Sequence, residues 1–304
     1  MPTMIPGAAR VSKVLSVVLG TDSIRFAPDR CDRFRLFQPP QSHQTGPDLP
    51  MLLAWLRRRR RRKIAARPFP EDWEEILRHN VRQYSSLDET EQQTLRTAVA
   101  IFVAEKSWEG CNGLDINDEI RVTIAGHACR LVLGFQGYVF DRLQTILVYP
   151  DTYVVREKDY SLGFEIEQDS LRLGEAWHQG PVILVWPSVM ADAHDARREQ
   201  NVVLHEFAHV LDMHDHHADG TPTLDSPEQY QTWDEVMRHE FAQLVDDIQS
   251  GRPTLLDQYG ATNLTEFFAV CSECFFECPR QMREHHGRLY DVLRRFYHQD
   301  PAGS

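Results

Sequence analysis

The chain lacks an apolar run of membrane-spanning length. Residues 51–56 are six apolar residues that end at a run of arginines, whereas a transmembrane helix needs about 20. Because the apolar residues precede the charges, their order is also the reverse of a secretory signal. The six cysteines show no compact disulfide framework, and Cys271, Cys274 and Cys278 are expected to be small buried thiols. We therefore expect a cytoplasmic protein without a transmembrane segment.

Positive charge is also in deficit. The 33 Lys and Arg residues face 45 Asp and Glu residues, and the net charge of −12 argues against direct nucleic-acid binding by the surface as a whole. The exception is residues 57–63, where six arginines and one lysine follow one another. We interpret residues 1–66 as a flexible N-terminal extension; contact of the arginine run with a membrane surface or nucleic acid is the alternative. A natural start at Met51 would remove most of this extension.

The most informative motif is His205-Glu206-Phe207-Ala208-His209, an H-E-x-x-H pattern. On a helix, residues four apart share a face, so His205 and His209 can direct imidazole nitrogens at one metal ion. Glu206 can reach a water on that ion without binding the ion. Zinc lowers the pKa of such a water and a carboxylate accepts its proton, so the pattern favours zinc-dependent hydrolysis. The surrounding residues 200–211 are apolar at helical spacing, as a buried helix requires.

A third metal ligand is needed, because zinc hydrolases usually supply three protein ligands. The sequence offers two routes to it. One route runs through a glycine turn to a further histidine, but the first glycine after His209 is Gly220. Asp212 is too far along the helix axis to share the ion, and we expect it to orient a ligand histidine. The other route takes a carboxylate from a second helix. Glu266 and Glu273 are seven residues apart there, and spacing leaves both open.

Periodicity also predicts the architecture. Helices are expected at residues 70–82, 86–106, 227–250 and 289–297, and around the two segments just described, the second ending at Phe276. Strands are expected at residues 119–124, 145–150, 153–155 and 182–186. A helical N-terminal half, a small mixed sheet, the motif helix and C-terminal helices together indicate an α+β domain. We further expect residues 182–186 or 161–168 to pair with extended substrate backbone.

Several separate blocks of the chain resemble one known family. They are residues 205–213 and 266–273, preceded in order by residues 101–106, 110–114, 121–125 and 180–186. This set resembles the MtfA (Mlc titration factor A) zinc peptidases, which are gluzincins related in their catalytic core to anthrax lethal factor. The resemblance implies a zincin-like peptidase domain at residues 67–298, followed by a tail at residues 299–304.

The resemblance also implies roles for individual residues. One zinc ion is bound by His205, His209 and Glu266, and Glu206 is the general base. Tyr259, seven residues before Glu266, reaches into the site, where its hydroxyl could stabilise an oxyanion; an ordinary core tyrosine is the alternative. The implied activity is aminopeptidase-like hydrolysis of short peptides, with Glu273 and Asp212 as candidates for holding the substrate amine.

A second function stays open. The family is named for members that bind the transcription repressor Mlc, so this chain could act mainly by sequestering an Mlc-like repressor, with catalysis secondary.

Overall fold

Helices form the first described part of the chain. The computed structural model describes residues 49–137, 139–151, 153–159, 166–172, 174–176, 180–195, 200–215 and 217–303. Its first elements are α1 (Leu49–Ala65), α2 (Glu71–Asn80), the 3-10 turn η1 (Arg82–Ser86) and α3 (Glu89–Glu105). A capping box starts α3: Asp88 accepts a hydrogen bond from the Glu91 N–H, and Glu91 returns one to the Asp88 N–H. The two helices predicted at residues 70–82 and 86–106 are confirmed.

A small mixed sheet follows. Its strand order is β1 (Ser107–Gly110), β2 (Thr145–Tyr149), β6 (Val182–Val185) and β5 (Gly174–Ala176). The first three strands are parallel, and β5 pairs antiparallel with β6. The strands β3 (Tyr153–Asp159) and β4 (Ile166–Arg172) form a separate antiparallel pair. The fold class, α+β with a small mixed sheet, is as predicted.

The predicted substrate-binding edge at residues 182–186 is wrong. Strand β6 lies inside the sheet, between β2 and β5, so both of its edges are already paired. Residue 186 is the first residue of α5 (Trp186–His194). Within the described sheet the unpaired edges belong to β1 and β5. For the alternative edge at 161–168, residues 161–165 lie outside the described residues.

The predicted strand at residues 119–124 is also wrong. These residues belong to α4 (Asp118–Leu131), which Asn117 caps by accepting a hydrogen bond from the Ile120 N–H. Every residue from Val122 to Leu131 is buried, including polar ones. A helix that is covered on all sides shows no 3.6-residue apolar period, and the short alternation at its start imitated a strand.

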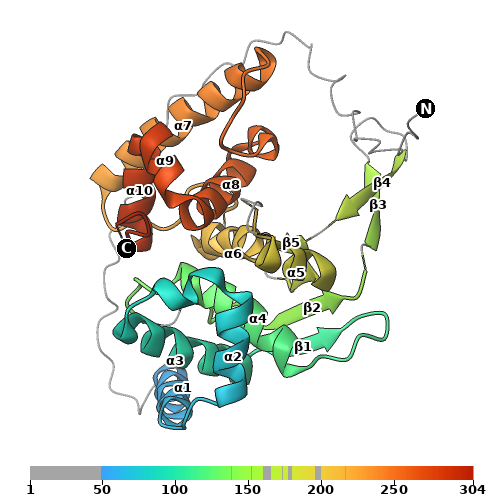
Figure 1. Cartoon of the computed structure of the whole chain (residues 1–304), viewed down its shortest axis with the longest axis vertical. Helices are drawn as coiled ribbons and strands as arrows, with labels where there is room; N and C mark the ends of the chain where they lie inside the picture. Colours follow the sequence, from blue (N-terminus) through green and yellow to red (C-terminus); the bar gives the residue numbers. More distant parts are fainter. Residues whose placement is uncertain are drawn as a thin grey trace, which may run out of the picture. The chain divides into compact units, whose positions relative to one another are not determined.

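The motif helix α6 (Val202–Asp212) lies at the centre of the domain. It contacts α4, α5, β5 and β6, and it packs most extensively on α8 (Leu264–Glu277) (Figure 1). The C-terminal part adds η2 (Met213–Asp215), α7 (Pro227–Gln249), η3 (Gln258–Ala261), α9 (Pro279–His285) and α10 (Gly287–Tyr297). The predicted helices at residues 227–250 and 289–297 are therefore confirmed.

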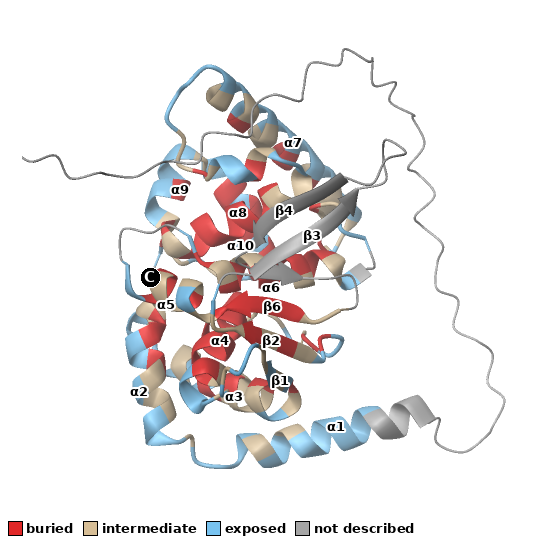
Figure 2. Cartoon of the chain, turned by 90° about the vertical axis from the view of Figure 1, so that its right-hand side faces the viewer, coloured by how far each residue is buried: buried red, intermediate tan, exposed pale blue. Residues whose placement is uncertain are grey.

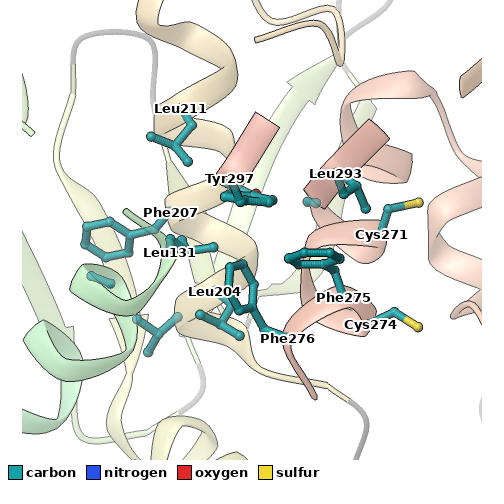
Figure 3. Close-up of a cluster of buried hydrophobic side chains, with 14 of the residues drawn as sticks. Leu131, Leu204, Phe207, Leu211, Cys271, Cys274, Phe275, Phe276, Leu293 and Tyr297 are labelled. Atoms are coloured by element: carbon teal, nitrogen blue, oxygen red, sulfur yellow. The ribbon is translucent and has the colours of Figure 1, made fainter. Parts of the chain in front are cut away.

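An aromatic core fixes the spacing between α6 and its neighbours (Figure 3). Leu204 of α6 lies beside Phe276 of α8, and Tyr297 of α10 contacts both Phe275 and Phe276. On the other side of α6, Phe207 contacts Phe102 and Phe140. These side chains are all buried, and each contributes about 2 kcal/mol of hydrophobic stabilisation. Cys271 and Cys274 line the same cluster as buried thiols, as predicted. The core therefore sets the distance at which side chains of α6 and α8 meet.

The arginine-rich run lies in helix α1. Arg61 donates to Glu105 at 2.7 Å and also pairs with Asp141, and Arg60 donates to the Ala104 carbonyl at 3.0 Å. This end of α1 is therefore held against the end of α3, while most of the helix is exposed (Figure 2). Residues 1–48 of the expected flexible extension lie outside the described residues, and the boundary between residues 66 and 67 stays a prediction. Within the parts of the chain that the structure describes, no helix combines the length and apolarity needed to cross a bilayer.

Candidate metal centre

Helix α6 presents three polar side chains of the H-E-x-x-H motif. Asn201 caps its start, because the Asn201 side chain accepts a hydrogen bond from the Leu204 N–H at 3.1 Å. The Val202 N–H is bonded to Asp192 of α5 at 2.9 Å. Both bonds satisfy N–H groups that a helix start leaves without intrahelical partners. The start of α6 is therefore held on two sides, which fixes the direction in which the motif side chains point.

Helix α8 brings Glu266 to the same place. Asn263 caps α8 by accepting a hydrogen bond from the Glu266 N–H at 2.9 Å, so Glu266 lies in the first turn. A carboxylate is favoured there by the positive end of the helix dipole. Glu266 is partly exposed, whereas the later residues of α8, Phe267–Phe276, are buried. The cap therefore places one carboxylate at the rim of an otherwise apolar helix.

Three side chains converge between the two helices. The Nε2 atoms of His205 and His209 lie 3.0 and 3.4 Å from Oε2 of Glu266. One nitrogen or oxygen atom from each of the three residues lies within 4.8 Å of the others. Zinc ligands at about 2.0–2.2 Å in a tetrahedral shell lie about 3.4 Å from one another. Two imidazoles and a carboxylate at these separations fit a single zinc-sized ion.

Burial and pairing set the charges of this cluster. Burial raises the pKa of Glu266, but its bonds to His205 and His209 outweigh burial and lower the pKa to about 2. Burial lowers the pKa of His209. Burial also opposes protonation of His205, yet Glu266 and Glu273 outweigh it and raise the pKa of His205 well above its usual range. An ionised carboxylate and a neutral imidazole are the forms that bind metal ions. The lowered pKa values of Glu266 and His209 favour these forms, whereas His205 would have to release its proton to a bound metal ion.

Glu273 lies on the other side of His205. Its Oε1 is 2.7 Å from His205 Nδ1, and its Oε2 accepts a hydrogen bond from the Asn201 N–H at 2.6 Å. The two glutamates that spacing left open are therefore separated by geometry: Glu266 meets the Nε2 edges of both histidines, and Glu273 meets the Nδ1 edge of one. This bond orients the His205 ring, a role that the sequence analysis assigned to Asp212.

Asp212 is fully buried at the end of α6. Its Oδ2 accepts a hydrogen bond from the Gly220 N–H at 2.9 Å, which closes the segment after the helix. Gly220 has a positive φ of 74°, and an added Cβ would meet the Leu264 carbonyl oxygen at 2.3 Å. Glycine is therefore required where this segment passes the start of α8. The expected bond between Asp212 and a ligand histidine stays a prediction.

Tyr259 lies in η3 at the edge of the cluster. Its ring centre is 6.0 Å from that of His205, and the residue is 56% exposed, which excludes an ordinary core tyrosine. Asp257 holds the turn: one carboxylate oxygen accepts the Tyr259 N–H at 2.8 Å, and the other accepts a bond from Gln200 at 2.5 Å. The tyrosine turn is thereby tied to the residues that lead into α6.

A buried polar network that the sequence did not indicate supports α6 from behind. The Asn201 side chain contacts His127 Nδ1 at 3.0 Å and donates to Glu277 at 3.1 Å. Burial lowers the pKa of His127 to about 4, so its ring is neutral. Arg82 pairs with Glu277 at 3.0 Å. No local sequence signal marks these residues, because they meet only after η1, α4, α6 and α8 have packed.

Comparison with known proteins places the chain in a family. The family model described as glucose-regulated metallo-peptidase M90 matches residues 55–298, well over half of the chain. This chain belongs to the M90 metallopeptidases. Mlc titration factor A of Yersinia pestis and that of Yersinia pseudotuberculosis are each 30% identical over 233 residues, which cover 75% of this chain and 84% of theirs. The uncharacterised Synechocystis protein slr2042 is 38% identical over 244 residues, 80% of this chain and 89% of its own length.

Family membership confirms the resemblance to Mlc titration factor A. It makes the chain a metal-dependent hydrolase whose substrates are peptides. The M90 match begins at residue 55, inside α1, and so includes the whole arginine run at residues 57–63.

Proposed function

We propose that this M90 protein is a zinc-dependent peptidase with aminopeptidase-like action. His205, His209 and Glu266 would hold one zinc ion, Glu206 would be the general base, and Tyr259 would stabilise the oxyanion. The observation that carries the proposal is the convergence of two imidazole nitrogens and one carboxylate oxygen from α6 and α8 within 4.8 Å. Chance rarely brings three such groups together in a largely apolar interior, because burying them costs free energy unless they are paired.

The mechanism follows from the position of each side chain. Zinc bound by His205, His209 and Glu266 would supply Lewis acidity toward the peptide carbonyl and toward a water molecule near neutral pH. Glu206, 4% exposed and next to His205 in the chain, would accept a proton from the attacking water and pass it to the leaving amine. Tyr259 donates a hydrogen bond to the developing oxyanion from the solvent side. Glu273 keeps the His205 ring in one orientation while the proton moves.

The substrate backbone would run along β5. This strand is an edge of the described sheet, is antiparallel to β6, and contacts α6. An extended peptide can add to such an edge through main-chain hydrogen bonds, which position the scissile carbonyl without reading many side chains. Strand β5 therefore takes the place of residues 182–186 in this proposal.

The free amine of an aminopeptidase substrate needs an anionic partner. Glu273 is bonded to His205 and Asn201, and the buried Asp212 is bonded to Gly220. Both of these candidates are therefore occupied in structural roles and are withdrawn. Comparing peptides with free and acetylated N-termini measures how much the amine contributes to kcat/KM.

The decisive experiment combines zinc content with hydrolysis of aminoacyl chromogenic substrates. Wild type and Glu206→Gln should bind equal zinc, and only wild type should turn over. Tyr259→Phe should retain zinc and KM but lose about 100-fold in kcat, the cost of removing one oxyanion donor. Full activity of Glu206→Gln would refute the assigned base, and zinc-free active protein would refute the metal site.

A second candidate function is binding of a transcription repressor. It is favoured by the similarity to proteins named Mlc titration factor A. Capture of an Mlc-like repressor by Glu206→Gln as well as by wild type would show binding that is independent of catalysis. Bound zinc without turnover in wild type would make this candidate the primary one.

A further inference from the structure

Helix α1 carries two kinds of side chain in two halves. Residues 51–56 are apolar without interruption, and residues 57–63 are six arginines and one lysine. Trp55 is 53% exposed and Leu56 is 46% exposed, and they belong to the few large hydrophobic side chains exposed among the described residues. Arg57, Arg58 and Arg59, which follow directly, are exposed as well. Apolar and cationic side chains are thus presented to solvent next to one another.

One side of α1 is already occupied. Arg61 pairs with Glu105 and Asp141, and Ile64, three residues on, is partly buried. With about 3.6 residues per turn, the side opposite Arg61 carries Trp55, Leu56, Arg59 and Lys63. Figure 2 shows α1 as a largely exposed helix along one end of the domain. The contacts at Arg60 and Arg61 fix which side of the helix faces outward.

We propose that the outward side of α1 binds an anionic lipid surface. The seven positive charges of residues 57–63 contrast with a net charge of −12, so the rest of the chain sums to −19 (−12 − 7). Helix α1 is therefore the positive pole of an acidic protein and is complementary to lipid phosphates. Trp55 and Leu56 supply the apolar contact, since Trp is favoured at the level of the headgroups.

The apolar half of the helix favours lipid over nucleic acid. A duplex offers phosphates to the arginines but no apolar phase for residues 51–56, whereas a bilayer offers both side by side. The Arg59 guanidinium lies 5.4 Å from the centre of the Trp55 ring, which keeps a cation next to the aromatic ring that would enter the interface. Arginine stems can lie along the apolar layer while their guanidinium groups reach the phosphates.

Vesicle sedimentation of the full chain tests this proposal. We expect binding to phosphatidylcholine vesicles that contain about 30% phosphatidylglycerol, weak binding to pure phosphatidylcholine, and weakening by salt. Each exposed cation of residues 57–63 should contribute about fivefold to the partition coefficient. A variant with four exposed cations that do not hold α1 on the domain changed to Gln should therefore bind at least about 100-fold more weakly; the four residues are Arg57, Arg58, Arg59 and Lys63.

Two further variants separate α1 from the charge of the whole protein. Trp55→Ser combined with Leu56→Ser should lower partitioning about tenfold without changing net charge. The matched control changes four exposed arginines on α9 and α10 to Gln, removing the same charge elsewhere, and should alter binding less than about threefold; these are Arg280, Arg283, Arg294 and Arg295. Arg60 and Arg61 are retained so that α1 stays docked, and equal thermal midpoints verify folding.

Three results would overturn the proposal. They are no preference for anionic over neutral vesicles, an equal loss of binding in the α9–α10 control, and tight binding of a labelled DNA duplex or RNA strand by a protein that ignores vesicles. The last result would assign α1 to nucleic acid. Because none of these variants touches α6 or α8, zinc content and peptide turnover remain a separate test of the proposed peptidase activity.

Discussion

Replacing Glu273 by Gln tests whether an orienting carboxylate behind His205 supports the metal centre. Glu273 accepts hydrogen bonds from His205 Nδ1 and from the Asn201 N–H, at 2.7 and 2.6 Å. A glutamine amide has one oxygen for these two donors. If that oxygen serves His205, the amide nitrogen faces the Asn201 N–H, and two donors oppose each other. The substitution therefore keeps the shape of the side chain but removes its charge and one acceptor.

The expected loss follows from these two bonds. A hydrogen bond to a charged group contributes about 1.5–3 kcal/mol. Loss of the bond to the Asn201 N–H should lower folding stability, because that bond holds the start of α6. Loss of the bond to His205 should lower metal affinity, because that bond orients the ring. Loss of an outer-shell partner typically lowers metal affinity about 10–100-fold, or about 1.4–2.8 kcal/mol. We expect zinc affinity of Glu273→Gln to fall by that factor and the metal-free protein to lose about 1–2 kcal/mol of stability.

Competition with a chromogenic zinc chelator measures the affinity, and urea unfolding of metal-free protein measures the stability. Glu277→Gln is the matched control, one turn later on α8. Its carboxylate is buried against Arg82 and Arg130, at 3.0 and 3.7 Å, and its Oε1 accepts from the Asn201 side chain at 3.1 Å. It should lose stability to a similar degree, while zinc affinity changes less than about threefold because no contact to His205 is removed.

Equal losses of zinc affinity in the two variants would refute the reasoning, since they would trace the effect to packing of α8. Unchanged affinity in Glu273→Gln would also refute it. A third result, weaker zinc binding with unchanged metal-free stability, would place the whole effect of Glu273 on the orientation of His205.

Two further predictions concern stability. Burial lowers the pKa of Lys106 to about 8 from 10.5, so the unfolded chain binds more protons between these values and stability rises with pH there. From pH 8 to pH 10, wild type should therefore gain about 2–3 kcal/mol of unfolding free energy relative to Lys106→Met. Urea titrations that show the same difference at both pH values would contradict this. In Gly126→Ala the new Cβ would meet Leu77 Cδ2 and Val81 Cγ2 at 2.7 Å. We expect this clash to outweigh the gain in helix propensity, so that Gly126→Ala loses about 1 kcal/mol of unfolding free energy and melts at a lower temperature. Gly287→Ala is the control: its Cβ has open space around it, so it should not lower the melting temperature.

The candidate site was largely predictable because its residues carry local signals. The spacing of His205 and His209 requires a helix to bring both rings to one side, and Asn263 marks the start of the helix that carries Glu266. Spacing alone could not decide between Glu266 and Glu273, since both lie on one face of α8, although the family resemblance implied Glu266. The choice depends on how far α8 is displaced along α6, and only the packed core determines that displacement. The network of His127, Asn201 and Glu277 gave no signal for the same reason.

The fold was predictable where one face of an element is exposed. Helix α7 has both buried and exposed residues, and its apolar period is therefore visible in the sequence. Helix α4 is buried on almost every side, and residues 119–124 imitated a strand. The position of β6 inside the sheet could not be predicted either. The four residues of β6 are all buried, as an inner strand requires, but the pairing partners on each side come from distant parts of the chain.

The geometry of the metal centre belongs to the packing of α6 on α8 more than to the H-E-x-x-H motif. The His205 ring is held between two carboxylates of one helix, Glu266 at Nε2 and Glu273 at Nδ1, which lie two turns apart. Both contacts can be short only if the two helices keep one separation and one register. The packing of Leu204 against Phe276, with Phe275 and Tyr297 around it, supplies that constraint, because close-packed side chains tolerate little sliding. The same sequence motif on a helix without such a neighbour would offer two histidines and no third group, so the apolar residues of α8 are as necessary to the site as Glu266 itself.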